Sequence, residues 1–270
     1  MRRVGNLSLS ISLEGFEEVN DIRRGEGVFN KVMATMDRLK KYGLIFGTSI
    51  CYTRKNIETV TSDEFLDMII GKGCRFTWYF HYMPVGNDAA PDLLPTKEQR
   101  EYMYHRVREI RSMTGGKPIY AMDFQNDGEF VGGCIAGGRN YCHINANGDV
   151  EPCVFIHYSS ANIREVTLLE ALKQPLFMAY RDRQPFNDNH LRPCPMLENP
   201  EILQEMIKET GAKSTDLQSP ESAEHLCSKC EAYACEWKET ADRLWKEHPH
   251  QQKGYTNYKK RTEKLKEKSV

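Results

Sequence analysis

The chain has 270 residues, of which 40% are hydrophobic and 28% charged, and its formal net charge is −1. This balance is typical of a globular protein and argues against disorder, fibrous repeats and a nucleic-acid partner. No run approaches the roughly 18 to 20 apolar residues that span a bilayer, and no apolar segment follows Arg2 and Arg3, so we expect a cytoplasmic protein with no membrane partner.

The first 113 residues alternate between predicted strands and helices. Strict apolar–polar alternation predicts a first strand over residues 7–13, and two further apolar runs have the length of strands. Apolar residues at helical spacing and two capping-box patterns, Thr61 with Glu64 and Thr96 with Gln99, predict the helices. The strands are expected at 7–13, 44–51 and 75–83, and the helices at 28–39, 61–70 and 96–113. Short connections between them indicate right-handed crossovers and a parallel sheet.

Small and polar residues alternate with apolar ones on all three predicted strands. They are Ser8, Ser10, Ser12, Gly47, Ser49, Thr77, Tyr79 and His81. Both faces of a parallel sheet are normally covered, so a polar face favours the small, polar interior of a barrel. The alternative is that the serines are merely tolerated small residues. Three strands do not close a barrel and would leave the edge of strand 7–13 unpaired, so either another segment covers this edge or the chain is the latter part of a longer protein.

Seven of the nine cysteines fall in the second half of the chain. They are Cys134, Cys142, Cys153, Cys194, Cys227, Cys230 and Cys235, whereas Cys51 and Cys74 are expected to be core residues. In a reducing compartment, clustered cysteines bind metal more often than they form disulfides. Zinc and iron–sulfur both remain open, and burial as small apolar side chains is the alternative for the three last cysteines.

Asn147 and Gly148 predict a hairpin with a two-residue type I′ turn, which would bring Cys142 and Cys153 close together. Thirteen residues separate Cys134 from Gly148, and four separate Gly148 from Cys153. This spacing resembles the opening signature of SPASM and twitch domains, which lie at the C-terminus of radical S-adenosylmethionine (SAM) enzymes and hold auxiliary [4Fe–4S] clusters.

The first strand independently resembles the same superfamily. Ser10 to Gly15, followed by Asp21-x-Arg23-Arg24-Gly25, is similar to its serine-rich strand and Asp-x-x-Arg-Gly loop. The resemblance implies the second half of a partial (β/α)₆ barrel, followed by a cysteine-rich α+β domain. It also implies that Ser10, Ser12 and Glu14 bind SAM through its ribose.

One defining feature of the superfamily does not occur in these 270 residues. No Cys-x-x-x-Cys-x-x-Cys segment is present to hold the catalytic cluster. The resemblance therefore implies a truncated or split enzyme that cleaves SAM only when an N-terminal half is supplied. A non-catalytic iron–sulfur electron-transfer or binding module and a zinc-stabilised structural protein are the alternatives.

The expected organisation has three parts: a half barrel at 1–116, an auxiliary-cluster domain at 117–200 and a helical extension at 201–270. The resemblance implies one auxiliary [4Fe–4S] cluster, held by Cys134, Cys153 and two of Cys194, Cys227 and Cys230. The partners that we expect are a peptide or small-molecule substrate and a reductase or separate N-terminal half.

Overall fold

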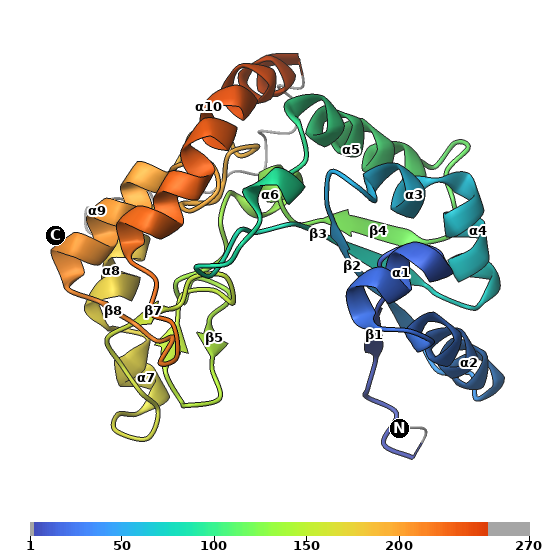
Figure 1. Ribbon diagram of the computed structural model, residues 1–270, viewed down its shortest axis with the longest axis horizontal. Coiled ribbons are helices and arrows are strands. Elements are labelled where there is room, and N and C mark those ends of the chain that lie inside the picture. The colour runs from blue at the N-terminus through green and yellow to red at the C-terminus, as the bar shows by residue number, and fades with distance from the viewer. Residues whose placement is uncertain (1–2, 248–270) are drawn as a thin grey trace, which may run out of the picture. The chain divides into compact units, whose positions relative to one another are not determined.

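The computed structural model describes residues 3–247, which form two compact units (Figure 1). The sheet unit comprises residues 3–82 and 92–126, and the cysteine unit comprises residues 83–91 and 127–247. Residues 83–91 belong to the cysteine unit because Glu221 accepts a hydrogen bond from the Gly86 amide at 2.9 Å and Lys229 donates to the Gly86 carbonyl at 2.7 Å. None of the helices within residues 3–247 is long and apolar enough to cross a membrane.

The sheet unit is built on four parallel strands in the order β1-β2-β3-β4 (Figure 1). The strands are β1 (Leu9–Ser12), β2 (Phe46–Tyr52), β3 (Phe76–His81) and β4 (Tyr120–Asp123). The helices are α1 (Glu17–Arg24), α2 (Val28–Lys41), α3 (Ile57–Thr61), α4 (Asp63–Gly71) and α5 (Lys97–Ile110). The α/β class and the parallel sheet are as predicted, but β4 was not predicted, because it is only four residues long and ends on a charged residue.

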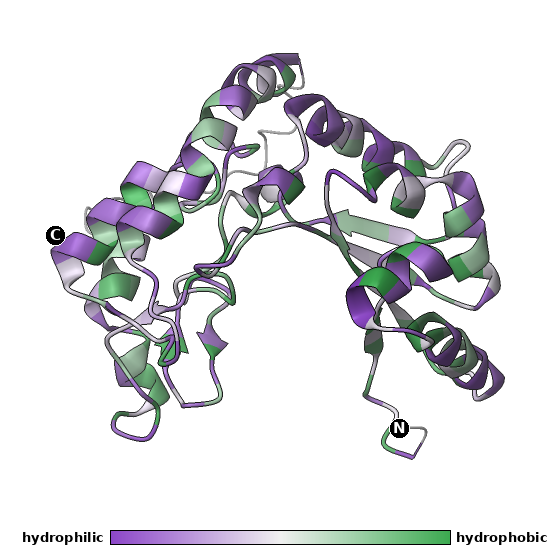
Figure 2. Ribbon diagram, viewed as in Figure 1, coloured by the Kyte–Doolittle hydropathy of each residue, from purple (hydrophilic) through white to green (hydrophobic). Residues whose placement is uncertain are grey.

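The helices cover one face of this sheet and form a continuous core with it. Phe46, Ile50 and Tyr79 from the strands are fully buried with Met36, Phe65, Ile69 and Met103 from the helices. Helix α5 places its apolar side chains on this core, whereas most of its residues are hydrophilic, as Figure 2 shows. Burial of this one face orders the three crossovers that connect the four strands.

The prediction that Thr77, Tyr79 and His81 face a polar interior is wrong. All three lie on the helix-covered face and are at most 1% exposed. Their polar atoms are satisfied inside the unit: Thr48 and Thr77 share a hydrogen bond of 2.9 Å, and the Tyr79 hydroxyl donates to the Val60 carbonyl at 2.8 Å. Buried polar groups are tolerated when they are hydrogen-bonded. The alternation of polar and apolar residues along β3 therefore did not show which face of the sheet the helices cover.

The opposite face of the sheet is partly exposed and has two characters. On β1 and β2 it carries Ser10, Ser12 and Ser49, with Ser12 in register with Ser49. On β3 and beyond β4 it carries aromatic rings, and Phe80 stacks on Phe124 with ring centroids 4.3 Å apart. The predicted serine face is therefore present on two strands only.

The cysteine unit is mostly loops and helices, with two small antiparallel sheets. One sheet pairs β5 (His143–Ile144) with β6 (Val150–Glu151), and the other pairs β7 (Tyr158–Ser159) with β8 (Lys213–Ser214). The helices are α6 (Gly128–Val131), α7 (Leu168–Ala171), α8 (Pro175–Arg183), α9 (Pro200–Thr210) and α10 (Ala223–Glu247). The predicted three-part division at residues 116 and 200 stays a prediction, and residues 248–270 of its last part lie outside the described residues.

The predicted hairpin between β5 and β6 is present, but its turn differs. A type I′ turn requires positive φ at both central residues, whereas Gly148 has φ 94° and Asn147 does not have a positive φ. The Asn145 carboxamide oxygen instead accepts hydrogen bonds from the amides of Asn147 and Asp149, at 2.9 and 3.0 Å. This side chain closes a wider loop that the dipeptide alone did not predict.

Candidate metal centre

Five cysteines of the cysteine unit come from four different segments. Cys134 follows α6 behind Gly132 and Gly133, both of which have positive φ. Cys153 follows β6, Cys194 lies in the loop between α8 and α9, and Cys227 and Cys230 lie on α10. Only glycine adopts positive φ readily, so the two glycines allow the sharp change of direction that precedes Cys134.

Burial raises the pKa of all five thiols. The pKa of Cys153 rises to about 11 and that of Cys134 to about 12. Burial also raises the pKa of Cys227 and Cys230 to about 12, and that of Cys194 well above its ordinary value. A metal-bound thiol loses its proton because the cation replaces it, so these buried sulfurs suit a bound cationic centre better than free thiolates.

Electrostatic influence links the five sulfurs in two groups, Cys134 with Cys153 and Cys194, and Cys227 with Cys230, and the Glu198 carboxylate acts on members of both groups. After burial, repulsion from Cys153 contributes to the raised pKa of Cys134, and repulsion from Cys134 and Cys153 contributes to that of Cys194. Cys227 acts on Cys230 in the same way. The fold therefore gathers the predicted ligands into one region of the cysteine unit, although they are up to 96 residues apart in sequence, from Cys134 to Cys230.

Backbone amides point at three of these sulfurs. The Ala136 amide donates to Cys134 Sγ at 3.5 Å and the Leu197 amide donates to Cys194 Sγ at 3.4 Å. The amides of Val154 and Phe155 donate to Cys153 and oppose part of the rise in its pKa. Amide donors stabilise thiolate charge and are one of the means by which a protein tunes an iron–sulfur cluster.

Two further residues border the cysteines and were not predicted from the sequence. Glu198 is 1% exposed, and its carboxylate accepts a hydrogen bond from the Cys194 amide at 2.7 Å. Tyr180 on α8 is fully buried, and its hydroxyl has no hydrogen-bond partner among the described residues. Neither stood out in the sequence, because only the fold brings α8 and the 194–198 loop to the cysteines.

Zinc and a four-iron cluster differ in how closely they draw their thiolate ligands together. Within residues 3–247, no three Cys, His, Asp or Glu side chains are arranged so that one metal ion could bind them together. Thiolates around one zinc would each lie about 2.3 Å from it. In a four-iron cluster each thiolate binds a different iron, so its ligands are spread more widely. The donor set, buried and amide-supported, fits a cluster of this kind.

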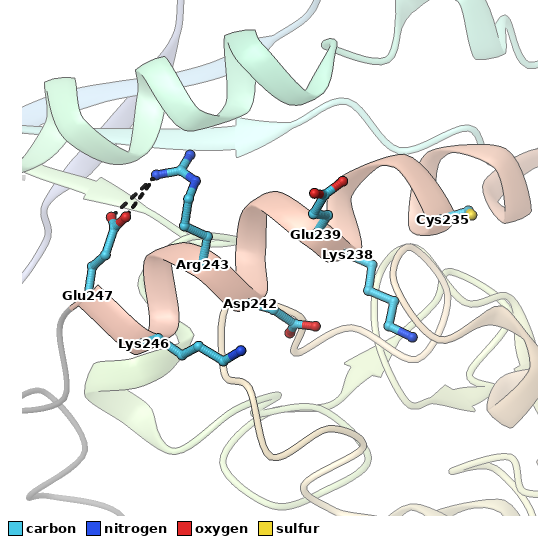
Figure 3. A pocket seen from close by; sticks show the side chains of 7 residues that line it. All are labelled: Cys235, Lys238, Glu239, Asp242, Arg243, Lys246 and Glu247. Atoms are coloured by element: carbon cyan, nitrogen blue, oxygen red, sulfur yellow. Dashed lines mark hydrogen bonds and ion pairs between the residues drawn. The ribbon is translucent and has the colours of Figure 1, made fainter.

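The remaining cysteines have other surroundings. Cys142 packs partly buried against Val150 and Ala171, and Cys74 is fully buried in the core of the sheet unit, as predicted. Cys51 on β2 hydrogen-bonds Arg23. Cys235 is exposed on α10, at one end of a groove of about 570 Å³ whose other described lining residues are all charged (Figure 3).

The residues predicted to bind SAM lie together at one edge of the sheet unit. Ser10 and Ser12 are partly buried on β1, and the Ser10 hydroxyl has no hydrogen-bond partner among the described residues. Glu14 is fully buried just beyond β1, where its carboxylate accepts hydrogen bonds from Arg23 at 3.2 Å and Arg24 at 3.1 Å. The Cys51 amide donates to the same carboxylate at 3.2 Å. Glu14 thus ties the end of α1 to β2.

The cysteine unit contains a segment that is similar to a known protein family. Residues 134–196 match the model of the SPASM family, an iron–sulfur cluster-binding domain. The mycofactocin maturase MftC of Mycolicibacterium smegmatis is 30% identical over 156 residues, which cover 55% of this chain and 39% of that protein. An AdoMet-dependent heme synthase of Oleidesulfovibrio alaskensis is 24% identical over 213 residues, which cover 69% of this chain and 54% of that protein. The chain therefore spans about half or less of the length of these relatives.

Two solved structures share the fold at low identity. The anSMEcpe enzyme with bound AdoMet and Cp18Cys peptide has a TM-score of 0.51 and 14% identity, covering 90% of this chain and 72% of that chain. Streptococcus suis SuiB bound to S-adenosylmethionine has a TM-score of 0.51 and 16% identity, covering 83% of this chain and 54% of that chain. At these identities the likeness describes the fold alone.

Proposed function

We propose that this chain is a radical SAM superfamily protein whose SPASM iron–sulfur cluster-binding domain, in the cysteine unit, holds one auxiliary [4Fe–4S] cluster. Cys134, Cys153 and Cys194 would supply three ligands, and Cys227 or Cys230 the fourth. The SPASM match over residues 134–196 carries this proposal, and the electrostatic grouping of the same cysteines supports it.

The chain's own residues prepare this site in three ways. Burial keeps solvent from the sulfurs, and the amides of Ala136 and Leu197 orient two of them. Glu198 holds the Cys194 amide and so fixes the loop between Pro193 and Pro195. When bound, the cluster would supply one-electron transfer or a binding point for a substrate group.

A second part of the proposal concerns SAM. Ser10 and Ser12 would contact its ribose, and Glu14 would hold Arg23 and Arg24 beside them through the ion pairs that it makes. The 270 residues contain no Cys-x-x-x-Cys-x-x-Cys segment, so SAM cleavage would need an N-terminal half. That half or a reductase, and a peptide or small-molecule substrate, would be the partners.

The cluster is tested by anaerobic reconstitution with iron and sulfide. We expect about four irons and four sulfides per chain and the brown charge-transfer absorption of a [4Fe–4S] centre. Cys134→Ala should lose most of the iron and the absorption. Cys235→Ala is the matched control and should keep both, because Cys235 is exposed, whereas the five candidate ligands are partly or fully buried. A colourless protein that holds one zinc per chain would contradict the proposal and favour the zinc-stabilised alternative.

The incomplete active site is tested by SAM cleavage. With a strong reductant, the reconstituted chain alone should release no 5′-deoxyadenosine from SAM, because no residue set in it matches the catalytic-cluster motif. Release of 5′-deoxyadenosine at one or more turnovers by this chain alone would show that the SAM-cleaving centre is complete within it.

A further inference from the structure

The Tyr180 side chain is the least explained polar group beside the cysteines. It lies on α8, is fully buried, and its hydroxyl forms no hydrogen bond to any described residue. Leaving such a group without a partner forfeits its hydrogen bond to water, so buried hydroxyls are nearly always paired. An apolar phenylalanine would fill the same space without this penalty. The hydroxyl therefore indicates a partner that the polypeptide does not provide.

The ring of Tyr180 is held in one position by its neighbours. Gly137 has φ 65° and lies so close that a Cβ atom there would be 2.5 Å from ring atoms Cγ and Cδ1. On another side Phe186 meets the ring edge to face, with centroids 5.2 Å apart. A ring packed in this way points its hydroxyl in a fixed direction.

The hydroxyl lies within electrostatic reach of the candidate ligands. After burial, the largest electrostatic influences on the hydroxyl come from Cys134, Cys194, Cys153 and Cys227, and all of them raise the pKa of Tyr180. A tyrosine hydroxyl is protonated at neutral pH and can donate a hydrogen bond. None of the four sulfurs is itself hydrogen-bonded to it, so the hydroxyl is available to a group that these sulfurs would bind.

We propose that Tyr180 donates a hydrogen bond to a sulfur of the bound cluster and raises the cluster's reduction potential. This inference rests on the proposed cluster site. A donor directed at a cluster sulfur stabilises the more negative, reduced state, because it offsets the added electron's charge. Tyr180 is thus a positioning residue that tunes electron transfer and not a ligand.

The test compares reconstituted wild-type protein with Tyr180→Phe, which keeps the ring and removes only the donor. Iron and sulfide content should be unchanged. The midpoint potential, measured by anaerobic spectroelectrochemistry, should fall by about 59 mV for a one-electron couple, equivalent to a tenfold change in the reduction equilibrium. Tyr79→Phe is the control: it removes a buried hydroxyl that donates to the Val60 carbonyl in the sheet unit, and it should leave the potential unchanged.

A second variant covers the case in which Tyr180→Phe holds less iron. Site-specific 3-fluorotyrosine at position 180 keeps the ring and makes the hydroxyl a stronger donor, so the potential should rise. A full iron content with an unchanged potential in either variant would overturn the inference while leaving the cluster in place. Wild-type protein that binds no cluster would instead overturn the proposed function, so the two failures are distinguishable.

Discussion

At the residue scale, we expect one buried histidine, His81, to make the stability of the sheet unit depend on pH. His81 at the end of β3 is 1% exposed, and its Nδ1 lies 2.6 Å from the carbonyl oxygen of Tyr82. Burial, aided by the positive charge of Arg100, lowers the pKa of His81 to about 3. The imidazole is therefore neutral in the folded protein across the physiological range.

As the pH falls, the buried His81 should lower the free energy of unfolding. Between the unfolded value of about 6.5 and the folded value of about 3, only the unfolded chain binds the proton, so the free energy of unfolding decreases with decreasing pH. The loss should reach about 2 kcal/mol at pH 5 relative to pH 7.5. In denaturant titrations of His81→Gln, that part of the pH dependence should disappear. His105→Gln, at an exposed histidine on α5, should keep the wild-type slope, and an unchanged slope in both variants would contradict this assignment.

At the scale of elements, β2 and β3 are packed closely at Gly47, which has no room for a side chain. Gly47 pairs in register with Phe76, and a Cβ atom on it would lie 2.2 Å from the Phe76 carbonyl oxygen and 2.4 Å from its ring. The backbone oxygen cannot move without breaking the parallel ladder. The need for glycine here comes from interstrand contact and not from its backbone angles.

Gly47→Ala should therefore lower the free energy of unfolding by about 2–3 kcal/mol, which is the upper range for overpacking. Gly71→Ala is the matched control, because Gly71 ends helix α4 and a Cβ atom there meets nothing within 4 Å. That control should be neutral or stabilise by up to about 1 kcal/mol. Equal effects of the two substitutions in urea titrations would refute the close-contact explanation.

At the scale of the whole molecule, the predicted cofactor and the hydrophobic core of the sheet belong to different units. This core lies under the sheet, whereas the candidate ligands lie in loops and in α10 of the cysteine unit. A ligand that binds only the folded state stabilises what it binds. Cluster loading should thus act mainly on the cysteine unit.

We expect anaerobic reconstitution to slow amide hydrogen exchange in residues 127–247 and to leave β2 and β3 little changed. Removing iron with a chelator should reverse the protection, since metal binding and folding of such sites are linked. Hydrogen-exchange mass spectrometry of apo and reconstituted protein measures both. Protection that appears equally in β2 would show that the two units respond to the cluster together.

Local sequence patterns were sufficient to predict much of the secondary structure and topology of this protein. Parallel β/α order follows from hydrophobic periodicity and short connections, and the hairpin follows from Asn147 and Gly148, because these signals act over neighbouring residues. The spacing of Cys134, Gly148 and Cys153 resembles that of SPASM domains, and residues 134–196 match the model of that family.

Only the tertiary structure decided which face of the sheet is covered, and it placed Thr77, Tyr79 and His81 beneath the helices, where pairing makes their polar atoms acceptable. It also brought Tyr180 and Glu198 to cysteines that are distant in sequence. These contacts join separate segments, and their energies depend on burial and on pairing across the fold. A pattern read along the chain contains neither quantity.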